Sequence, residues 1–199
     1  KGFHQFLKGI DKAFHTFEPI REEIDWEYQK SVLNEYNTSE SNILSVANNQ
    51  RILHHFLFGK DTEFEDVEIE KRPKTYFPHR TKTSLSYKYD TIPVTLDKMQ
   101  IEIDLTIEYQ GTVGIFEAKN GKPENFSVYQ LFHPYLYYYN AKKYIKKGAK
   151  IKEIIAVYLV KNKDKKNTYI SLWAYTFTDP TNICSIKLLK SSRYKLIVK

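Results

Sequence analysis

Two neighbouring segments decide the fold of this chain: Ile101-Glu102-Ile103-Asp104-Leu105 and Val113-Gly114-Ile115-Phe116-Glu117-Ala118-Lys119. Apolar residues alternate through both segments, which is typical of β-strands, and the turn residues Gln110-Gly111-Thr112 lie between them. We therefore expect a β-hairpin. Because side chains on a strand alternate between two faces, Glu117 and Lys119 should share one face, as should Glu102 and Asp104 on the neighbouring strand.

The predicted hairpin gathers carboxylates and an ammonium group where a sheet is ordinarily apolar. Isolated charges are costly in such a place, so the cluster requires mutual pairing, solvent or a metal ion. A same-face ion pair on a solvated strand is the alternative interpretation. Against it, charge comes only at the end of an otherwise apolar face on the second strand: Val113, Ile115, Glu117, Lys119.

This arrangement resembles the PD-(D/E)xK nuclease superfamily, which includes many type II restriction endonucleases. Asp104 matches the lone acid and Glu117-Ala118-Lys119 matches the tripeptide, whereas Ile103 stands where the family usually has proline. Asp164-Lys165-Lys166 also fits the tripeptide, but no apolar strand leads into it. The resemblance covers roughly residues 100 to 160.

The resemblance implies an α/β fold of the α+β variety, with a central mixed sheet flanked by helices, and Mg²⁺-dependent hydrolysis of DNA. Asp104 and Glu117 are the expected metal ligands, together with the carbonyl of Ala118. Lys119 would orient or deprotonate the attacking water. Two close carboxylates suit Mg²⁺, which keeps several waters and takes one or two acids along with substrate phosphate.

A helix is predicted to follow the second strand. Ser127 and Gln130 fit a capping box, Gly148 would end the helix, and Pro134 predicts a kink or a late start. An apolar strand over residues 151–160 should then lie centrally in the sheet. In many relatives a polar residue near the start of this helix faces the active site, so Gln130 is either a catalytic residue or a capping partner.

Aromatic residues are frequent on the same predicted helix. We expect them to pack against the sheet, although base stacking or a dimer contact are alternatives. His133 is expected to be a surface or hydrogen-bonded histidine rather than a catalytic one. The tyrosines concerned are Tyr135, Tyr137, Tyr138, Tyr139 and Tyr144.

The first part of the chain is predicted to be helical. Residues 39–58 form an amphipathic pattern that Gly59 would end, and residues 3–30 carry a stripe of phenylalanines before Pro19. Glu40 is a possible auxiliary acid by the same resemblance, but an acid in the first turn of a helix is also favoured by the helix dipole.

Two basic stretches are candidates for DNA contact. Arg80 and Lys82 lie in a polar segment before the hairpin, where their cations suit phosphates, although a solvated loop has a similar composition. Near the end of the chain, cations alternate with apolar residues, as in a strand pair lining a DNA cleft or an edge protected by lysines. These cations are Lys187, Lys190, Arg193 and Lys195.

Length and composition set the remaining limits. The 199 residues suit a single nuclease domain, with a helical part in 1–60, a catalytic core in 85–160 and strands in 161–199. The net charge of +7 suits a polyanion, and the single Cys184 fits a reducing cytoplasm. No apolar run reaches membrane-spanning length and no signal peptide is visible. The chain opens at Lys1 and not at methionine, which is compatible with a trimmed or partial chain.

Taken with the resemblance, these observations predict a type II restriction endonuclease that cuts double-stranded DNA as a homodimer in the bacterial cytoplasm. Two other functions stay open. One is a DNA-binding module that keeps the nuclease fold without catalysis, and the other is a DNA repair or recombination nuclease.

Overall fold

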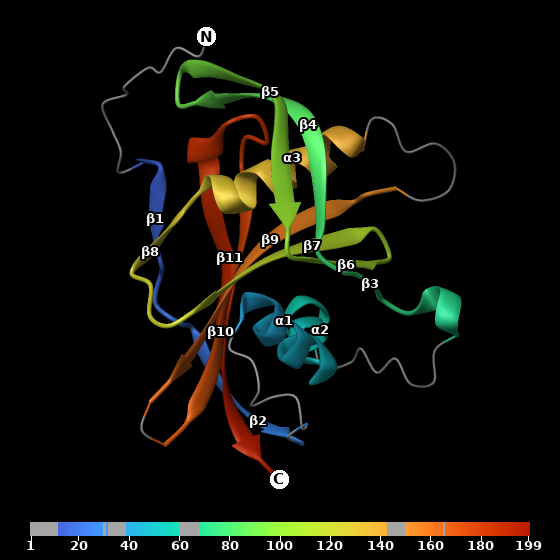
Figure 1. Ribbon diagram of the computed structural model, residues 1–199, viewed down its shortest axis with the longest axis vertical. Coiled ribbons are helices and arrows are strands. Elements are labelled where there is room, and N and C mark those ends of the chain that lie inside the picture. Colours follow the sequence, from blue (N-terminus) through green and yellow to red (C-terminus); the bar gives the residue numbers. More distant parts are fainter. Residues whose placement is uncertain (1–11, 30, 32–38, 60–67, 143–149, 165) are drawn as a thin grey trace.

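A mixed seven-stranded sheet forms the centre of the protein (Figure 1). The computed structural model describes residues 12–29, 31, 39–59, 68–142, 150–164 and 166–199. Neighbouring strands are antiparallel except for two parallel pairs, β2 with β11 and β7 with β9. In spatial order the strands are β2 (Glu22–Tyr28), β11 (Ile186–Val198), β10 (Thr168–Phe177), β9 (Glu153–Lys163), β7 (Thr112–Asn120), β6 (Leu105–Tyr109) and β3 (Lys74–Tyr76).

The predicted hairpin is confirmed as β6 and β7, which pair from Leu105 opposite Phe116 to Tyr109 opposite Thr112. Its two-residue turn needs positive φ at both central positions, and Gln110 and Gly111 have φ values of 50° and 91°. The predicted apolar strand is confirmed as β9, which lies between β7 and β10 and is buried along most of its length. The protein is thus α+β with a mixed central sheet, as expected from the sequence.

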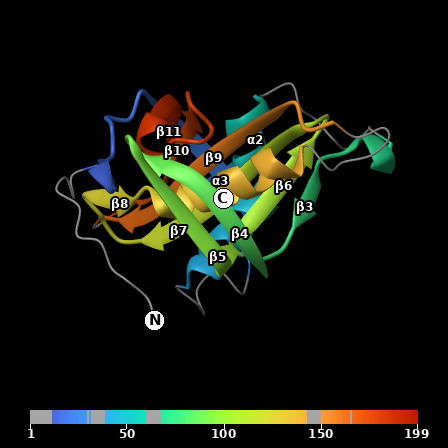
Figure 2. The same cartoon turned by 90° about the horizontal axis from the view of Figure 1, so that it is seen from above.

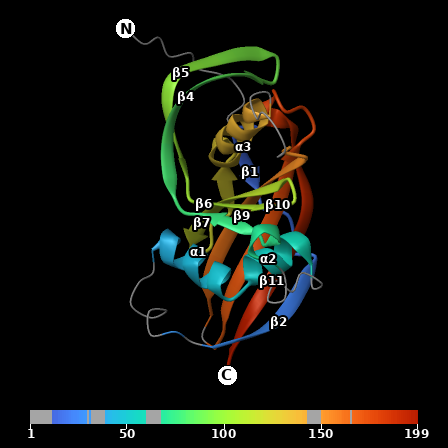
Figure 3. The same cartoon turned by 90° about the vertical axis from the view of Figure 1, so that its right-hand side faces the viewer.

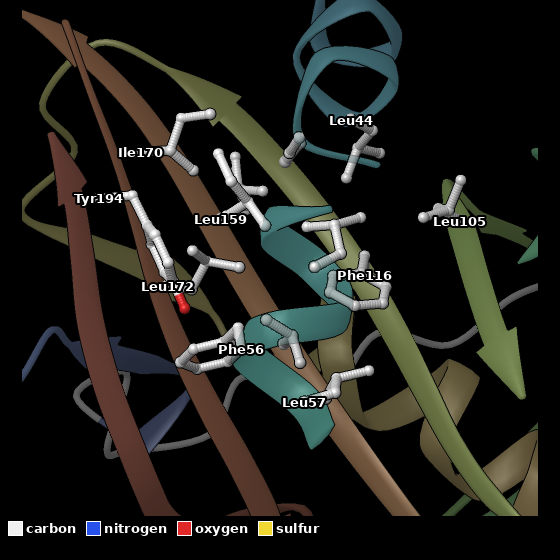
Figure 4. Packing of buried hydrophobic residues seen from close by; sticks show 14 of the residues in the cluster. Leu44, Phe56, Leu57, Leu105, Phe116, Leu159, Ile170, Leu172 and Tyr194 are labelled. Carbon is white, nitrogen blue, oxygen red and sulfur yellow. The ribbon is translucent and has the colours of Figure 1, made fainter. Parts of the chain in front are cut away.

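Helices α1 (Glu40–Asn49) and α2 (Ile52–Phe58) cover one face of this sheet. Figure 4 shows Phe56 beside Leu172 of β10, and Leu44 at the other end of the same cluster of buried residues. The apolar positions of both helices are almost completely buried, which stabilises the sheet on this side by the hydrophobic effect. The larger members of the cluster are Leu44, Phe56, Leu57, Leu105, Phe116, Leu159, Leu172 and Tyr194.

Helix α3 (Tyr129–Ala141) covers the other face, and a separate hairpin of β4 (His79–Tyr89) and β5 (Ile92–Ile103) arches over it. Figures 2 and 3 show α3 between this hairpin and the sheet. Residues of all three parts share one core cluster, which includes Leu85 and Ile103 from the hairpin, Ile115 from β7 and Phe132 from α3. The hairpin is therefore packed onto the domain and is not an isolated arm.

The first strand of the predicted site is not continuous. β5 ends at Ile103, Asp104 forms a bend, and β6 begins at Leu105. Ile103 packs with α3, whereas Leu105 packs with α1 and α2 on the opposite face. The prediction that residues 101–105 form one strand is therefore wrong: Ile103 and Leu105 are both buried, but on opposite faces, because the chain passes from one sheet to another at Asp104.

The helical prediction for residues 3–30 is wrong wherever that stretch is described. β1 (Phe14–Thr16) pairs with β8 (Asn125–Ser127), and β2 adds to the sheet edge beside β11. In β2, Ile24 and Trp26 turn toward the core while Asp25 and Glu27 stay exposed, a period of two and not of 3.6. Residues 1–11 lie outside the described part of the chain.

Two further helix boundaries differ from the sequence prediction. The helix predicted over residues 39–58 is divided between α1 and α2 by Arg51, whose φ of 62° is left-handed, and it ends at Gly59 as expected. The predicted capping box is absent, because Ser127 belongs to β8 and α3 begins at Tyr129 without a side-chain cap. α3 continues through Pro134, and its predicted end at Gly148 lies outside the described residues.

No helix in the described ranges is long and apolar enough to span a membrane.

Strands occupy most of residues 161–199, as predicted. β11 pairs with β10 over Ile186–Leu196 but with β2 only over Ser192–Val198, so among the described strands its first half, which carries Lys187 and Lys190, is an edge, as one interpretation suggested. Lys190 donates hydrogen bonds to the carbonyls of Phe56 and Leu57 and lies over the Phe56 ring. This basic stretch therefore contributes in part to the packing of α2.

Candidate active site

The predicted site residues come together at one wall of a cavity of about 830 Å³ between the β4–β5 hairpin, the start of α3 and the ends of α1 and β7. Asp104 reaches it from the β5–β6 bend, and Glu117 and Lys119 from the end of β7. We name five residues the carboxylate site: Glu40, Asp104, Glu117, Lys119 and Gln130. Four different elements of structure thus supply one cluster.

Asp104 is held by the bend that separates the two sheets. Its Oδ2 accepts a hydrogen bond from the backbone N–H of Ala118 at 3.4 Å. Burial raises the pKa of Asp104 above its ordinary value; the Ala118 N–H opposes the rise and the nearby charge of Glu40 adds to it. The Ala118 side chain is itself fully buried on the opposite face of β7, toward α1 and α2.

Glu117 is the most buried carboxylate of the site. Burial and the charge of Asp104 raise its pKa to about 8, which the proximity of Lys119 only partly offsets. Its Oε1 accepts a hydrogen bond from Gln130 Nε2 at 2.7 Å. Gln130 therefore faces the site, one of its two predicted roles, and the capping role is excluded by the later start of α3.

Lys119 lies between two carboxylates. Its Nζ is 2.5 Å from Glu40 Oε1 and 3.7 Å from Glu117 Oε1. Burial alone would lower the pKa of Lys119, but the hydrogen bond with Glu40 and the charges of Glu117 and Asp104 together raise it. Lys119 is thus favoured as a charged ammonium group over a neutral amine.

Glu40 lies where the auxiliary acid was expected. Ser39 caps α1 by accepting the N–H of Asn42 at 3.2 Å, which places Glu40 in the first turn of the helix. Glu40 also accepts a hydrogen bond from Lys119. It therefore both occupies a favourable position in the helix dipole and contacts the site.

The composition of the cavity wall suits a divalent cation. Among the described residues that line it there are four carboxylates and a single lysine, Lys119: the acids are Glu40, Glu102, Asp104 and Glu117. Two of these, Asp104 and Glu117, are largely withdrawn from water and have raised pKa values, which a cation would relieve. No group of three His, Cys or acidic side chains within the described ranges is arranged to hold a metal, so Mg²⁺ would also need water and substrate oxygens as ligands.

Neither of the cations predicted to contact DNA lines this cavity. Both lie on the exposed face of β4, so the polar segment is a strand and not the solvated loop of the alternative interpretation. Arg80 pairs with Glu102 at 3.1 Å across the hairpin, which brings it to the cavity rim, while Lys82 is exposed one position further along the same face.

The second copy of the tripeptide has no part in the site. Asp164 is exposed in the turn after β9, where its Oδ1 accepts the N–H groups of Lys166 and Asn167 at 2.8 and 2.7 Å. Those hydrogen bonds lower the pKa of Asp164, as expected for an acid that stabilises a turn.

Sequence reasoning missed the aromatic lining of the cavity. Tyr87 and Tyr89 from β4 and Tyr129 from α3 take part in it. The alternation Leu85, Tyr87, Tyr89 is the signal that could have revealed them, because it indicates a strand with an apolar face. His133 is buried and hydrogen-bonded to Tyr87, as a satisfied histidine was expected to be, and Tyr135 packs in the core.

A family model for a domain of unknown function, DUF6997, matches residues 9–195. No curated protein and no solved structure matches the chain. The matched range contains the whole carboxylate site and all described strands except the last residues of β11. The chain therefore belongs to the DUF6997 family.

Proposed function

We propose that this protein is a Mg²⁺-dependent DNA endonuclease with a restriction endonuclease-like fold and a PD-(D/E)xK site. The observation that carries the proposal is the convergence of Asp104, Glu117 and Lys119 at one cavity wall from a strand junction and a strand end. These are the groups that the resemblance requires, and a core position next to Val113 and Ile115 offers no stabilising reason for a buried acid.

The reaction is a phosphodiester hydrolysis. A water oxygen forms a bond to phosphorus, the bond from phosphorus to the leaving deoxyribose oxygen breaks, and the proton that the water loses is matched by one gained at that oxygen. When bound, Mg²⁺ would neutralise charge on the phosphate and lower the pKa of water. Asp104, Glu117 and the carbonyl of Ala118 are the residues that would hold it.

The other residues of the site orient the reacting groups. Lys119, fixed by Glu40 and Glu117, would direct an ammonium donor at the attacking water or at a phosphate oxygen. Gln130 fixes the carboxylate of Glu117 through its 2.7 Å hydrogen bond. Glu40 is a positioning residue, because it acts on the substrate through Lys119.

The biological role that we propose is that of a type II restriction endonuclease acting on double-stranded DNA in the cytoplasm. The net charge of +7 supports a polyanionic substrate, as do the exposed cations Arg80 and Lys82 beside the cavity. A homodimer would supply the two sites needed to cut both strands.

Digestion of a long DNA of known sequence tests this proposal. With Mg²⁺ the wild-type protein should give discrete fragments, and Asp104→Asn, Glu117→Gln and Lys119→Ala should each lower the rate at least about 100-fold. Asp164→Asn and Lys166→Ala are matched controls, because they alter the second tripeptide in its exposed turn. Their rates should equal that of the wild type.

Other outcomes select other functions. Undiminished Mg²⁺-dependent cleavage by all three site variants would exclude the carboxylate site. Salt-sensitive binding without product in either Mg²⁺ or Mn²⁺ would favour a DNA-binding module. Preferential cleavage of branched or damaged DNA would favour a repair or recombination nuclease.

A further inference from the structure

The cavity beside the carboxylate site has a second, aromatic part. Tyr87, Tyr89, Leu96 and Met99 from the β4–β5 hairpin line it opposite Tyr129 and His133 from α3. The whole cavity, with both parts together, has a volume of about 830 Å³, within the range of ligand pockets, about 300–1,000 Å³. A site for phosphate chemistry alone needs no such lining.

The hairpin that forms the aromatic wall is held in place at its closed end. The Lys88 N–H donates to the Thr181 carbonyl at 2.7 Å, and Asn182 Nδ2 donates to the Asp90 carbonyl at 3.3 Å. At its other end the hairpin continues through Asp104 into β6. Figure 3 shows the resulting arch over α3. The aromatic wall is therefore part of a fixed structure.

Tyr87 joins the hairpin to α3 in the middle of the arch. Its hydroxyl lies 3.1 Å from His133 Nε2, and its ring packs edge-on against Phe132 with a centroid distance of 5.1 Å. Burial lowers the pKa of His133 to about 4, so this imidazole is neutral at pH 7. The aromatic part thus presents uncharged rings, in contrast with the acids beside it.

The two parts of the cavity are one helical turn apart. Gln130 contacts Glu117 of the carboxylate site, and His133 follows three residues later on α3, a spacing that separates Cβ atoms by about 5–6 Å. Tyr129 precedes Gln130 and remains 53% exposed, with its ring 5.6 Å from that of His133. A ligand that spans both parts must carry an anionic group joined through a short linker to a flat apolar one.

We propose that the aromatic part of the cavity receives one unpaired nucleobase of the DNA strand whose neighbouring phosphodiester lies at the carboxylate site. A phosphate, its sugar and its base have the required order of anion, linker and ring. A base within a duplex has both faces stacked on its neighbours, whereas an unpaired or extruded base can stack on tyrosine. The inference rests on the proposed nuclease function and specifies how DNA is held at the cut, with one base beside the cleaved bond extruded from the duplex or already unpaired.

Binding measurements with three matched DNAs test the proposal. One is a fully paired duplex, the second carries one unpaired nucleotide, and the third carries an abasic residue at that unpaired position. Fluorescence anisotropy in Ca²⁺ should show binding of the second about 5- to 100-fold tighter than of the third, because stacking on an aromatic side chain is lost without the base.

Variants of Tyr129 locate the base within the protein. Tyr129→Ala should bring the two dissociation constants toward equality, while Tyr129→Phe should preserve the preference. Tyr76→Ala is a matched control, because Tyr76 is 51% exposed on β3 and does not line the cavity. Because Tyr129 is exposed, both of its variants should keep the fold, and circular dichroism would check this.

Each outcome decides between the two proposals. Equal binding of the base-containing and abasic bulges by the wild type overturns the base pocket, as does an undiminished preference in Tyr129→Ala. Mg²⁺-dependent cleavage together with equal binding overturns the pocket and leaves the nuclease function. A base preference without cleavage of any DNA supports the pocket and overturns the hydrolysis.

Discussion

At the level of single residues, Glu117 is the member of the carboxylate site that least suits its buried surroundings. It follows Val113 and Ile115 on the face of β7 that packs toward α3, where another aliphatic residue would suit the core. Instead an acid with a pKa raised to about 8 lies there, satisfied by a hydrogen bond from Gln130. Buried acids of this kind are concentrated at functional sites, since they lower stability unless a cation or a substrate compensates them.

His133 provides a prediction on stability and pH. Burial lowers its pKa from 6.5 to about 4, so the unfolded chain binds a proton at higher pH than the folded protein does. The contribution of neutral His133 to the free energy of unfolding is fully present above pH 6.5. It is lost as the pH falls toward 4, by about 3 kcal/mol in total. Denaturant unfolding measured between pH 7 and pH 4 should show this loss.

His133→Gln removes the titration and keeps a polar group near Tyr87. Its stability should fall less steeply than that of the wild type between pH 6.5 and pH 4, although it should be lower at pH 7 because packing is lost. His54, whose pKa burial also lowers to about 4, is present in both proteins and cancels from the comparison. Parallel curves for the two proteins would contradict the assignment to His133.

At the level of elements, local patterns predicted the β6–β7 hairpin and the central strand β9. The turn residues Gln110 and Gly111 adopt the positive φ values that such a turn requires, and the Ile and Val run of β9 is buried as expected. Both elements depend on interactions between residues close in sequence or on hydrophobicity alone, so they can be predicted from a single sequence.

The features that sequence missed depend on contacts between distant segments. Alternation continues through Asp104, yet Ile103 and Leu105 pack on opposite faces because the chain changes sheets there. The helix predicted over residues 3–30 includes residues 22–28, but pairing with β11 holds them in strand β2. Ser127 satisfies the capping pattern, but pairing with β1 holds it in β8.

The anchor of the β4–β5 hairpin gives a prediction at this scale. Asn182 donates to the Asp90 carbonyl and also accepts the N–H of Cys184, so Asn182→Ala removes both contacts. The variant should lose about 1 kcal/mol of stability at this end of the hairpin. Hydrogen exchange at the Lys88 amide, which donates to the Thr181 carbonyl, should therefore be roughly fivefold faster. Hydrogen exchange followed by NMR measures this rate. Thr95→Ala, on the exposed face of the same hairpin, should leave it unchanged, and an equal effect of both variants would argue against the anchor.

Across the whole molecule, charge is distributed unevenly between cavity and surface. The chain carries a net charge of +7, yet the cavity wall is acidic among the described residues, with Glu40, Asp104 and Glu117 around Lys119. The excess of positive charge therefore lies outside the cavity wall, and a polyanion at the site would be favoured by a bound cation. Under the proposed function, this separates DNA binding, governed by exposed cations, from cleavage, governed by Mg²⁺.

Lys82 tests that separation, because it lies on the exposed face of β4 and does not line the cavity. If it contacts a phosphate, Lys82→Ala should weaken DNA binding equally for all sequences and reduce the slope of log K against log salt by about 1. Arg80→Ala should change the slope less, since Arg80 already pairs with Glu102 at 3.1 Å. Lys163→Ala, at the end of β9, is the control and should leave the slope unchanged. Equal slopes for Lys82→Ala and the wild type would mean that DNA approaches by another face, because counterion release counts the phosphates that a protein neutralises.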